Sequence, residues 1–534
     1  MNGTRSKKSE PAIVRKWKRL RDGGEPRVLD LFAGCGGISL GFRSAGFEIL
    51  GAAEIDKDAA RTHGINFFGN GYSEGHESSR DVHDEPSGLF SDLKVRSSPE
   101  NVVDVLVGGP PCQAFARIGR AKLRSEARRL NSRSADEAFL NDERADLVWQ
   151  YLRIVQETKP LVILIENVPD MLNFGGQNVA ELVCEELDRQ GYSAGYTLLN
   201  SVFYGVPQTR ERMFLLAYRK ELGVAVRWPK PTHYFDLPRG YDGTRATALK
   251  HILKFDEKGL LEDIEHNFHH FQFPSPDDFL VSAVSAKDAL ADLPRILALR
   301  DFQAGCLRRG VRDLSTTQRY TQDASSGYAA LMREWPGFSS DQAVTGHVIR
   351  YLPRDFKIFR MMKPGWQYPQ IWERVEQEKK KLLARRSRVG LSTKMSDPEV
   401  RRLTEEWTLP YDKSKFPNKW WKLRADEPSR TLLAHLGKDS YSHIHYESAQ
   451  ARTISVREAA RLQSFPDGFH FSGGMNAAFR QIGNAVPPLV SYSIAREVRC
   501  SLGLPLLPDI RDGYLWDAGS ENAHREKREK ACNF

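Results

Sequence analysis

The chain has 534 residues, of which 40% are hydrophobic, so it can form two or more domains with substantial cores. Its net charge of +9 favours a polyanionic partner. No apolar stretch could span a bilayer or act as an N-terminal signal, and the six cysteines form no CxxC pair. We therefore expect a cytoplasmic protein with no membrane segment, no disulfide framework and no metal site.

Short apolar runs alternate with helical patterns from residue 27 onward. Strands are expected at 28–32, 48–54, 102–107 and 161–166, and helices at 38–45, 145–157 and 179–190. This alternation predicts an α/β fold with a doubly wound, mostly parallel sheet. A further strand is expected at 213–218.

The alternation ends near residue 225. Residues 226–426 are rich in Pro, Trp, His and charge, and their one clear element is a basic amphipathic helix at 371–388. Regular patterning returns at 456–463 and 489–500. We predict a basic flexible arm, a first α/β part, a smaller irregular domain, a returning α/β part and a charged tail. Their boundaries are 1–26, 27–225, 226–470, 471–503 and 504–534.

A cysteine follows the third expected strand on a rigid turn. Residues 109–113 read Gly-Pro-Pro-Cys-Gln, and each proline locks φ and removes a donor. An α/β enzyme holds a nucleophile at such a strand end. A lone cysteine is more often a buried structural thiol, but the proline pair and the polar Gln113 favour Cys112 as a nucleophile.

A glycine-rich turn joins the first expected strand to its helix. Residues 30–37 read Asp-Leu-Phe-Ala-Gly-Cys-Gly-Gly, and Glu54 ends the next strand 17 residues beyond Gly37. Glycines let the backbone approach a ligand, and a carboxylate at that place suits ribose hydroxyls. The spacing is not G-x-G-x-x-G and a P-loop lysine is missing, so a nucleoside without phosphates fits best. An ordinary tight turn is the alternative.

Three further motifs complete an ordered set. They are Glu166-Asn167-Val168, Gln-Thr-Arg-Glu-Arg at 208–212 and Gly-Asn-Ala-Val-Pro-Pro at 483–488. With this set the sequence resembles the cytosine-C5 DNA methyltransferases over 28–220 and 427–500. The resemblance implies a DNA (cytosine-5-)-methyltransferase with a Rossmann-like methyltransferase fold, S-adenosyl-L-methionine as cofactor and double-stranded DNA as partner. It makes the α/β parts the catalytic domain and the irregular domain the target-recognition domain.

The chemistry of C5 methylation gives each catalytic motif a role. Cytosine C5 is a poor nucleophile until a thiolate adds at C6, so the resemblance makes Cys112 the expected nucleophile. Glu166 could supply a proton at N3 if burial raises its pKa. Arg212 and Arg210 would hold the cytosine O2 with planar donors. Turn capping by Glu166 and surface salt bridges of the arginines are the alternatives.

The resemblance and the glycine-rich turn at 30–37 together predict a set of cofactor-binding residues. Asp81 is a candidate for adenine, with a solvated loop aspartate as the alternative. Asn484 and Val486 would return to the pocket from late in the chain. The full set is Asp30, Phe32, Ala33, Gly34, Gly36, Gly37, Glu54, Asp81, Pro110, Leu147, Asn484 and Val486.

A basic segment follows the cysteine. Seven Lys and Arg lie within the 17 positions 117–133, and Glu126 is the one acid before Asp136. This pattern suits phosphate clamping, with a solvated charged helix as the alternative. The predicted DNA-binding residues are Gln113, Arg117, Arg120, Lys122, Arg124, Arg128 and Arg129. The family has Gly and Ser where this chain has Ala114 and Ala116.

Two other functions stay open. One is an RNA cytosine-C5 methyltransferase, although the Cys-Phe-Thr signature of such relatives is missing. The other is a catalytically inactive nucleic-acid-binding relative, against which the presence of Cys112 argues. For the DNA enzyme the target base must be flipped out of the duplex. We expect a monomer in a bacterial or phage restriction-modification or antiviral defence setting, with companion restriction or defence proteins as candidate partners.

Overall fold

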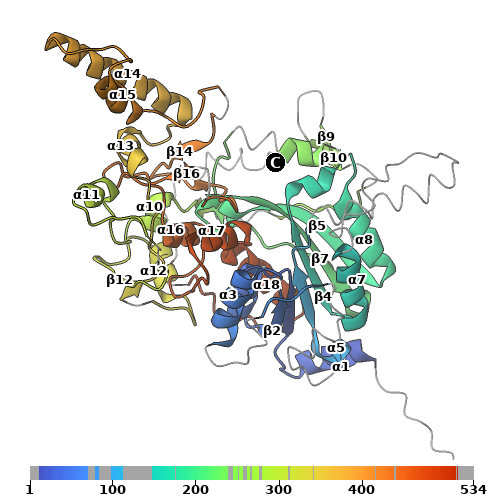
Figure 1. Cartoon of the computed structure of the whole chain (residues 1–534). Coiled ribbons are helices and arrows are strands. Elements are labelled where there is room, and N and C mark those ends of the chain that lie inside the picture. Colours follow the sequence, from blue (N-terminus) through green and yellow to red (C-terminus); the bar gives the residue numbers. More distant parts are fainter. Residues whose placement is uncertain are drawn as a thin grey trace, which may run out of the picture. The chain divides into compact units, whose positions relative to one another are not determined.

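The structure is a computed structural model of the chain. It describes residues 11–69, 78–82, 98–111, 147–174, 176–238, 245–250, 252–255, 261–264, 268–275, 280–310, 313–340, 342–414, 417–437, 441–512 and 514. The chain divides into two compact units, which are Met1–Ala283 with Ala485–Phe534, and Val284–Asn484. Each unit is described by itself below (Figure 1).

A six-stranded sheet forms the centre of the first unit. Its strands are β1 (Arg27–Leu31), β2 (Glu48–Ala53), β3 (Val105–Gly108), β4 (Val162–Asn167), β5 (Tyr192–Asn200) and β7 (Glu211–Arg219). The order is β2-β1-β3-β4-β7-β5, in which β1 to β4 are parallel and β7 is antiparallel to both neighbours. The central strands are runs of Val, Leu and Ile that are buried on both faces, as a helix-covered sheet requires. The predicted α/β fold is confirmed.

Helices cover both faces of this sheet. They are α2 (Gly37–Ser44), α3 (Lys57–Phe68), α5 (Pro99–Val102), α7 (Leu147–Thr158), α8 (Val179–Arg189) and α18 (Pro488–Ser501). Figure 1 shows α7 and α8 on one side of the sheet and α3 and α18 on the other. The strand expected from residue 102 is wrong at its start, because Pro99 begins a helical turn that ends at Val102.

The last helix packs against the first helix of the sheet. A Cβ at Gly41 of α2 would lie 2.1 Å from Ser491 Oγ, so only glycine allows this approach. Ser491 Oγ also donates to the carbonyl of Gly37 at 2.8 Å. The two ends of the first unit are therefore joined by direct contact between α2 and α18.

The N-terminal segment contains a helix, α1 (Ala12–Arg21). Ala12, Lys16 and Leu20 are spaced by four residues and form its buried face. Lys16 Nζ donates to the carbonyls of Val103 at 2.8 Å, Thr158 at 3.0 Å and Lys159 at 2.7 Å. The predicted flexible arm is therefore wrong for 12–21, since this helix holds the amino ends of β3 and β4.

The boundary between the units differs from the predicted 225. Within the first unit, β8 (His233–Tyr234) pairs with β11 (Val281–Ser282), and the backbone of Tyr196 in β5 exchanges hydrogen bonds with residues 270 and 272. Residues 270–272 thus pair along the edge strand β5, and β8 and β11 form a separate two-stranded sheet in the same unit. The other short elements here are η3 (Pro169–Asn173), η4 (Ser201–Tyr204), β6 (Gln208–Thr209), η5 (Lys220–Leu222), β9 (Leu253–Phe255) and β10 (Leu261–Ile264).

The second unit consists of the long helix α14, several short helices and strands of two to four residues. They are α10 (Ala286–Leu290), α11 (Ala298–Gln303), β12 (Gln318–Arg319), α12 (Gly327–Glu334), β13 (Ala343–Val344), α13 (Pro353–Met361), α14 (Tyr368–Arg388), α15 (Pro398–Glu405), β14 (Trp420–Lys422), β15 (Ser429–Arg430), β16 (Tyr441–Ile444), α16 (Val456–Leu462) and α17 (Met475–Asn484). Phe356, Phe359 and Trp420 form part of its apolar core. The return to the first unit comes after residue 484, not at the predicted 471.

A buried ion pair fixes the start of α16 in this unit. Arg452 donates to both oxygens of Glu458, at 2.6 and 2.7 Å, and the backbone N–H of Ser455 donates to Glu458 Oε2 at 2.6 Å. Both side chains are 1% exposed. Burial favours the neutral carboxyl, but the Arg452 guanidinium holds the pKa of Glu458 well below its ordinary value.

Candidate functional site

The candidate site lies at the carboxyl ends of the parallel strands. Phe32, Glu54 and Gly109 directly follow β1, β2 and β3, and Glu166 lies near the end of β4. In open α/β sheets ligands bind outside these strand ends. The structure therefore brings the predicted turn, carboxylate and catalytic motifs to one edge of the sheet.

The glycine-rich turn is held tightly on two sides and is open on a third. Gly36 has φ +99°, and a Cβ there would lie 2.4 Å from the Phe67 ring of α3. A Cβ at Gly37 would lie 2.1 Å from the carbonyl oxygen of Val486. A Cβ at Gly34 would meet nothing within 4 Å. The turn is thus fixed by its neighbours and leaves open space beside Gly34 for a ligand.

Two non-glycine positions of the turn also have defined geometry. Phe32 has φ +57°, an uncommon conformation for a bulky residue. Ala33 donates its N–H to the carbonyl of Ala53 at 3.2 Å and accepts from Gly36 at 2.9 Å. These bonds turn the chain from the end of β1 toward α2.

Glu54 links this turn to the end of β2. Its Oε2 accepts from the N–H of Gly34 at 2.9 Å, and its Oε1 accepts from the N–H of Asp56 at 2.8 Å. Burial raises the pKa of Glu54 in spite of these two donors. The N–H of Arg80 donates to the Glu54 carbonyl at 2.7 Å, so the neighbouring Asp81 lies in a segment attached to the same strand end.

Asp30 lies beneath the turn in a buried network that the sequence analysis did not find. Its Oδ2 accepts from Ser39 Oγ at 2.6 Å, and Ser39 Oγ lies 2.9 Å from His63 Nε2. The Oδ1 atom is buried and has no hydrogen-bond partner within the described residues. Burial raises the pKa of Asp30 to about 7. Ser39 was the sequence signal for this network, because the tight turn after β1 places the first turn of α2 next to Asp30.

The residues here fit the nucleoside part of S-adenosylmethionine. Open glycine backbone at Gly34 stands beside the Glu54 carboxylate, which has two oxygens to accept from hydroxyls. Asp30 adds a carboxyl oxygen that lacks a partner in the described part of the chain. Residues 30–37 of this turn contain no lysine. This agrees with a ligand that has no phosphate groups at this place.

Glu166 pairs with Arg212 next to the Gly-Pro-Pro turn. Arg212 Nε lies 3.1 Å from Glu166 Oε1, and the two side chains are 17% and 13% exposed. A Cβ at Gly109 would lie 3.0 Å from Glu166 Oε2, so glycine makes room for the carboxyl. Asn167 Nδ2 donates to the Pro110 carbonyl at 2.7 Å. Asn167 is part of the sequence motif at 166–168, but its pattern gave no role for it.

Burial raises the pKa of Glu166, while Arg212 and Arg210 lower it. The net direction is upward, as expected for a carboxyl that supplies a proton. Arg210 is 2% exposed and its backbone exchanges hydrogen bonds with Ser201, at 2.8 and 3.2 Å. Neither arginine forms the exposed salt bridge that was the alternative.

Glu211, between the two arginines, is a buried charge that the sequence analysis missed. It is 4% exposed and pairs with Arg245 at 3.2 Å. Burial raises its pKa. The pair fixes β7 to residues 245–249, beyond the predicted end of the first α/β part.

Several predicted residues lie outside the described ones and stay predictions. These are Cys112, Gln113, Arg117, Arg120, Lys122, Arg124, Arg128 and Arg129. Leu147, the first residue of α7, packs partly buried against the sheet core. Asn484 is the exposed last residue of α17 in the second unit. Val486 belongs to the first unit, where its carbonyl approaches Gly37.

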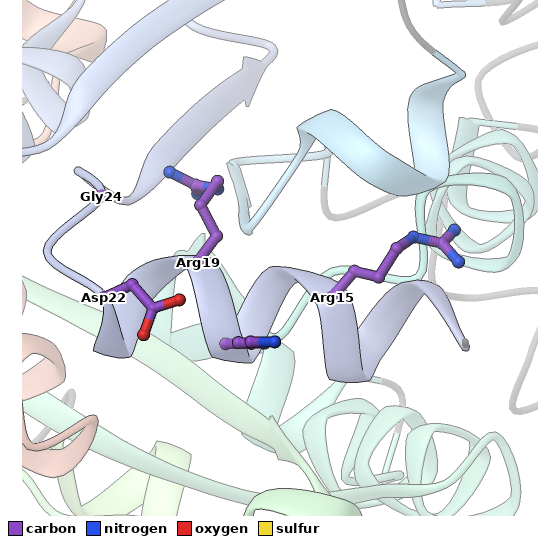
Figure 2. A pocket seen from close by; sticks show the side chains of 5 residues that line it. Arg15, Arg19, Asp22 and Gly24 are labelled. Atoms are coloured by element: carbon purple, nitrogen blue, oxygen red, sulfur yellow. The ribbon is translucent and has the colours of Figure 1, made fainter. Parts of the chain in front are cut away.

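A pocket of about 470 Å³ lies beside α1. Arg15, Lys18, Arg19, Asp22 and Gly24 line it (Figure 2). Arg19 pairs with Asp104, at the amino-terminal side of β3, so the pocket is at the opposite edge of the sheet from Glu166. None of the predicted cofactor-binding residues lines this pocket, and we assign no function to it.

Two negative findings apply to the described part of the chain. It holds no group of three or more His, Cys, Asp and Glu side chains arranged to bind a metal ion. None of its helices is both long enough and apolar enough to cross a membrane.

Comparison with known proteins gives a consistent result. The family profile of C-5 cytosine-specific DNA methylases matches residues 26–500. A protein of Oceanobacillus iheyensis named as a type II methyltransferase is 36% identical, over 89% of this chain and 95% of its own length. The type II methyltransferase M.AgeI of Thalassovita gelatinovora is 30% identical, over 89% of this chain and all of its own length.

A solved structure agrees at the level of the fold. An Escherichia coli prophage protein described as a DNA modification methyltransferase aligns with a TM-score of 0.53 and 20% identity. The alignment covers 90% of this chain and all of that protein.

Proposed function

The chain belongs to the C-5 cytosine-specific DNA methylase family, and we propose that Cys112, Glu166, Arg210 and Arg212 carry out its reaction. The protein is a DNA (cytosine-5-)-methyltransferase, it uses S-adenosylmethionine, and its substrate is DNA. No finding supports the RNA alternative or a catalytically inactive relative.

The reaction begins with the Cys112 thiolate, which forms a bond to C6 of the flipped cytosine. The electron pair of the C5–C6 double bond is then available at C5, and the Glu166 carboxyl supplies a proton or hydrogen bond at N3 as negative charge develops. Arg212 and Arg210 donate to O2. S-adenosylmethionine supplies the methyl group as an electrophile when it is bound. Solvent water takes the C5 proton, the C5–C6 double bond re-forms as the Cys112 sulfur leaves C6 as a thiolate, and N3 returns its proton to Glu166.

The observation that carries this proposal is the Glu166–Arg212 pair against Gly109. The carboxyl has a raised pKa, a guanidinium 3.1 Å away and direct access to the turn that leads to Cys112. A proton donor, a carbonyl-binding donor and a nucleophile are the three groups that the chemistry needs. Glu54 and Gly34 support the cofactor assignment, with Asp30, Phe32, Ala33, Gly36, Gly37, Asp81, Pro110, Leu147, Asn484 and Val486 as further candidates.

We extend the proposal to the biological setting. Relatives named as bacterial type II methyltransferases support a specific duplex site and a role in restriction-modification or antiviral defence. The basic residues after Cys112 would hold DNA phosphates, and the second unit would read the flanking bases. We further propose a cytoplasmic monomer whose reaction needs no metal.

A trapping experiment tests the nucleophile. Duplex DNA with 5-fluorocytosine at the target should form a covalent complex that survives denaturant, because fluorine blocks the final elimination. Cys112→Ala should abolish this complex and turnover while S-adenosylmethionine binding persists. The matched control is Cys500→Ser, which changes an exposed cysteine of the same unit and should trap normally. Appreciable turnover by Cys112→Ala would overturn the assignment.

A further inference from the structure

A helical hairpin in the second unit carries an uneven charge. It consists of α14, α15 and the connection 389–397. Residues 379–402 contain nine Lys and Arg but only two Asp and Glu, while the whole chain has a net charge of +9. This 24-residue stretch therefore has a net charge of +7, from nine basic and two acidic residues, well above the level of an average surface.

The charges near the start of α14 are neutralised within the helix. Arg374 pairs with Glu378 at 3.0 Å, Lys379 with Glu376 at 2.8 Å and Lys381 with Glu378 at 3.0 Å. This is the ordinary pattern of a solvated helix face. This pairing of basic with acidic side chains ends at Lys381, because the rest of α14 contains no Asp or Glu.

The far half of the hairpin has exposed cations without acidic partners. Six of them make no ion pair with any described residue and are exposed: Lys380, Arg385, Arg388, Lys394, Arg401 and Arg402. On α14, Arg385 and Arg388 share one face with Lys381, which itself pairs with Glu378, since the three are four and three residues apart. They span about 10 Å along the helix axis, a length over which a DNA strand presents several phosphates.

The tip is an ordered turn in which the acids are already used. Arg386 Nε donates to the Ser392 carbonyl at 3.0 Å, and its Nη2 donates to Glu399 at 2.9 Å. Asp397 caps α15 by accepting from the N–H of Glu399 at 2.9 Å. Because both acids are engaged in the turn itself, the six exposed cations form no ion pair with either of them.

The base of the hairpin is anchored in the core of the second unit. Tyr368, Ile371 and Val375 are fully buried there. Figure 1 shows α14 and α15 side by side, extending beyond α13 and away from the rest of this unit. The hairpin is thus a fixed projection that presents positive charge to solvent on its outer half.

We propose that this hairpin binds the phosphate backbone of the DNA duplex, outside the bases that the enzyme reads. The inference rests on DNA as the substrate and gives the hairpin a role in affinity that is common to all sequences. A lipid surface is the less suitable partner, because the apolar side of α14 is packed in the core and only Val389, Leu391 and Met395 are exposed at the tip.

The test uses the full-length enzyme and a triple variant, Lys380→Gln with Arg385→Gln and Arg388→Gln. Dissociation constants are measured over a range of salt on a long duplex with the methylation site and on one without it. Binding should weaken about 10-fold or more by the same factor on both, and the salt slope should fall by about one unit per lost contact. S-adenosylmethionine binding and kcat at saturating DNA should not change, which separates this proposal from a failure of the proposed function.

Two controls test charge and position. The variant Lys380→Arg, Arg385→Lys, Arg388→Lys keeps the charges and should keep the wild-type slope. The variant Lys287→Gln, Arg319→Gln, Arg360→Gln removes three exposed cations of the same unit outside the hairpin and should have a smaller effect.

Four results would overturn the inference. They are an unchanged slope in the hairpin variant, an equal loss in the control away from the hairpin, a loss confined to the cognate duplex, and loss of binding to phosphatidylglycerol vesicles with DNA binding intact.

Discussion

Glu166 in the first unit and Glu458 in the second are both buried glutamates that face an arginine, yet their pKa values shift in opposite directions. Glu458 accepts two bonds from Arg452 and one from a backbone N–H. Glu166 has one contact with Arg212, at 3.1 Å, and touches the turn at Gly109.

The difference shows that the number of donors decides what a buried carboxyl does. With three short donors the charged form is stabilised, and Glu458 is a fixed structural anion. With one longer contact the cost of burial prevails, and the pKa of Glu166 is raised, the direction that a proton-supplying carboxyl needs. A site that must transfer a proton needs a carboxyl that is less well paired than a structural one.

The largest expected effect comes from Glu166→Gln. The amide keeps the size of the side chain but cannot deliver a proton to N3, so kcat should fall by about 10²- to 10⁴-fold. Single-turnover methyl transfer measures this loss, and thermal unfolding should show a folded protein. Near-normal turnover would mean that Glu166 only caps the turn, the alternative raised by the sequence.

Glu458→Gln should instead destabilise the fold. It leaves the buried Arg452 charge without its partner, which costs about 3–5 kcal/mol. Denaturant unfolding of the two variants side by side measures this cost. The double variant Arg452→Met, Glu458→Leu should be less destabilised than Glu458→Gln, because no charge then remains unpaired. Equal stability of Glu458→Gln and wild type would contradict a structural role.

Glu54 is an intermediate case, with two backbone donors and a raised pKa. Glu54→Ala should weaken S-adenosylmethionine binding by about 1–3 kcal/mol, because hydroxyls lose their acceptor and the Gly34 turn loses its bond. Calorimetry measures the affinity. Asp188→Ala, an exposed carboxylate of the same unit, serves as the control. Unchanged affinity would show that Glu54 only ends a strand.

The smallest effect is the opposite pH dependence of the two glutamates. The pKa of Glu458 is lowered in the folded state, so its stabilisation is present above pH 4.5 and is lost as pH falls below that value. The pKa of Glu166 is raised, so the folded state keeps the proton longer and loses stability as pH rises above 4.5. Unfolding free energies of wild type and the two Gln variants should diverge in these windows, by at most about 1.4 kcal/mol per pH unit. Parallel curves would contradict the comparison.

The sequence predicted those parts of the fold that depend on local apolar runs. The cores of β1, β2, β3 and β4 were found, whereas β5 was missed because Gly195 and polar residues interrupt its pattern. The helix α1 was missed for another reason. Lys16 is buried only because three carbonyls 87 to 143 residues away accept from it, and no local pattern shows that.

The sequence predicted members of the site but not their pairing. The motif order identified Glu166 and Arg212, yet their contact depends on β7 lying antiparallel beside β4, which a long connection brings about. The Asp30–Ser39–His63 network needs α3 to pack under the turn. The end of the first α/β part was misplaced because residues 232–234, 270–272 and 281–283 attach through backbone bonds, which depend little on side-chain type.

The contact of Gly41 and Gly37 with Ser491 has a consequence for how the protein is made. The bond from Ser491 to Gly37 joins residues 454 positions apart. At about 5–20 residues per second, a ribosome needs on the order of 20–90 s to synthesise that length of chain. During this time α2 waits without its partner helix, with its apolar face uncovered. Chains that stop before residue 485 should therefore depend on chaperones and aggregate, even though they contain every strand of the sheet.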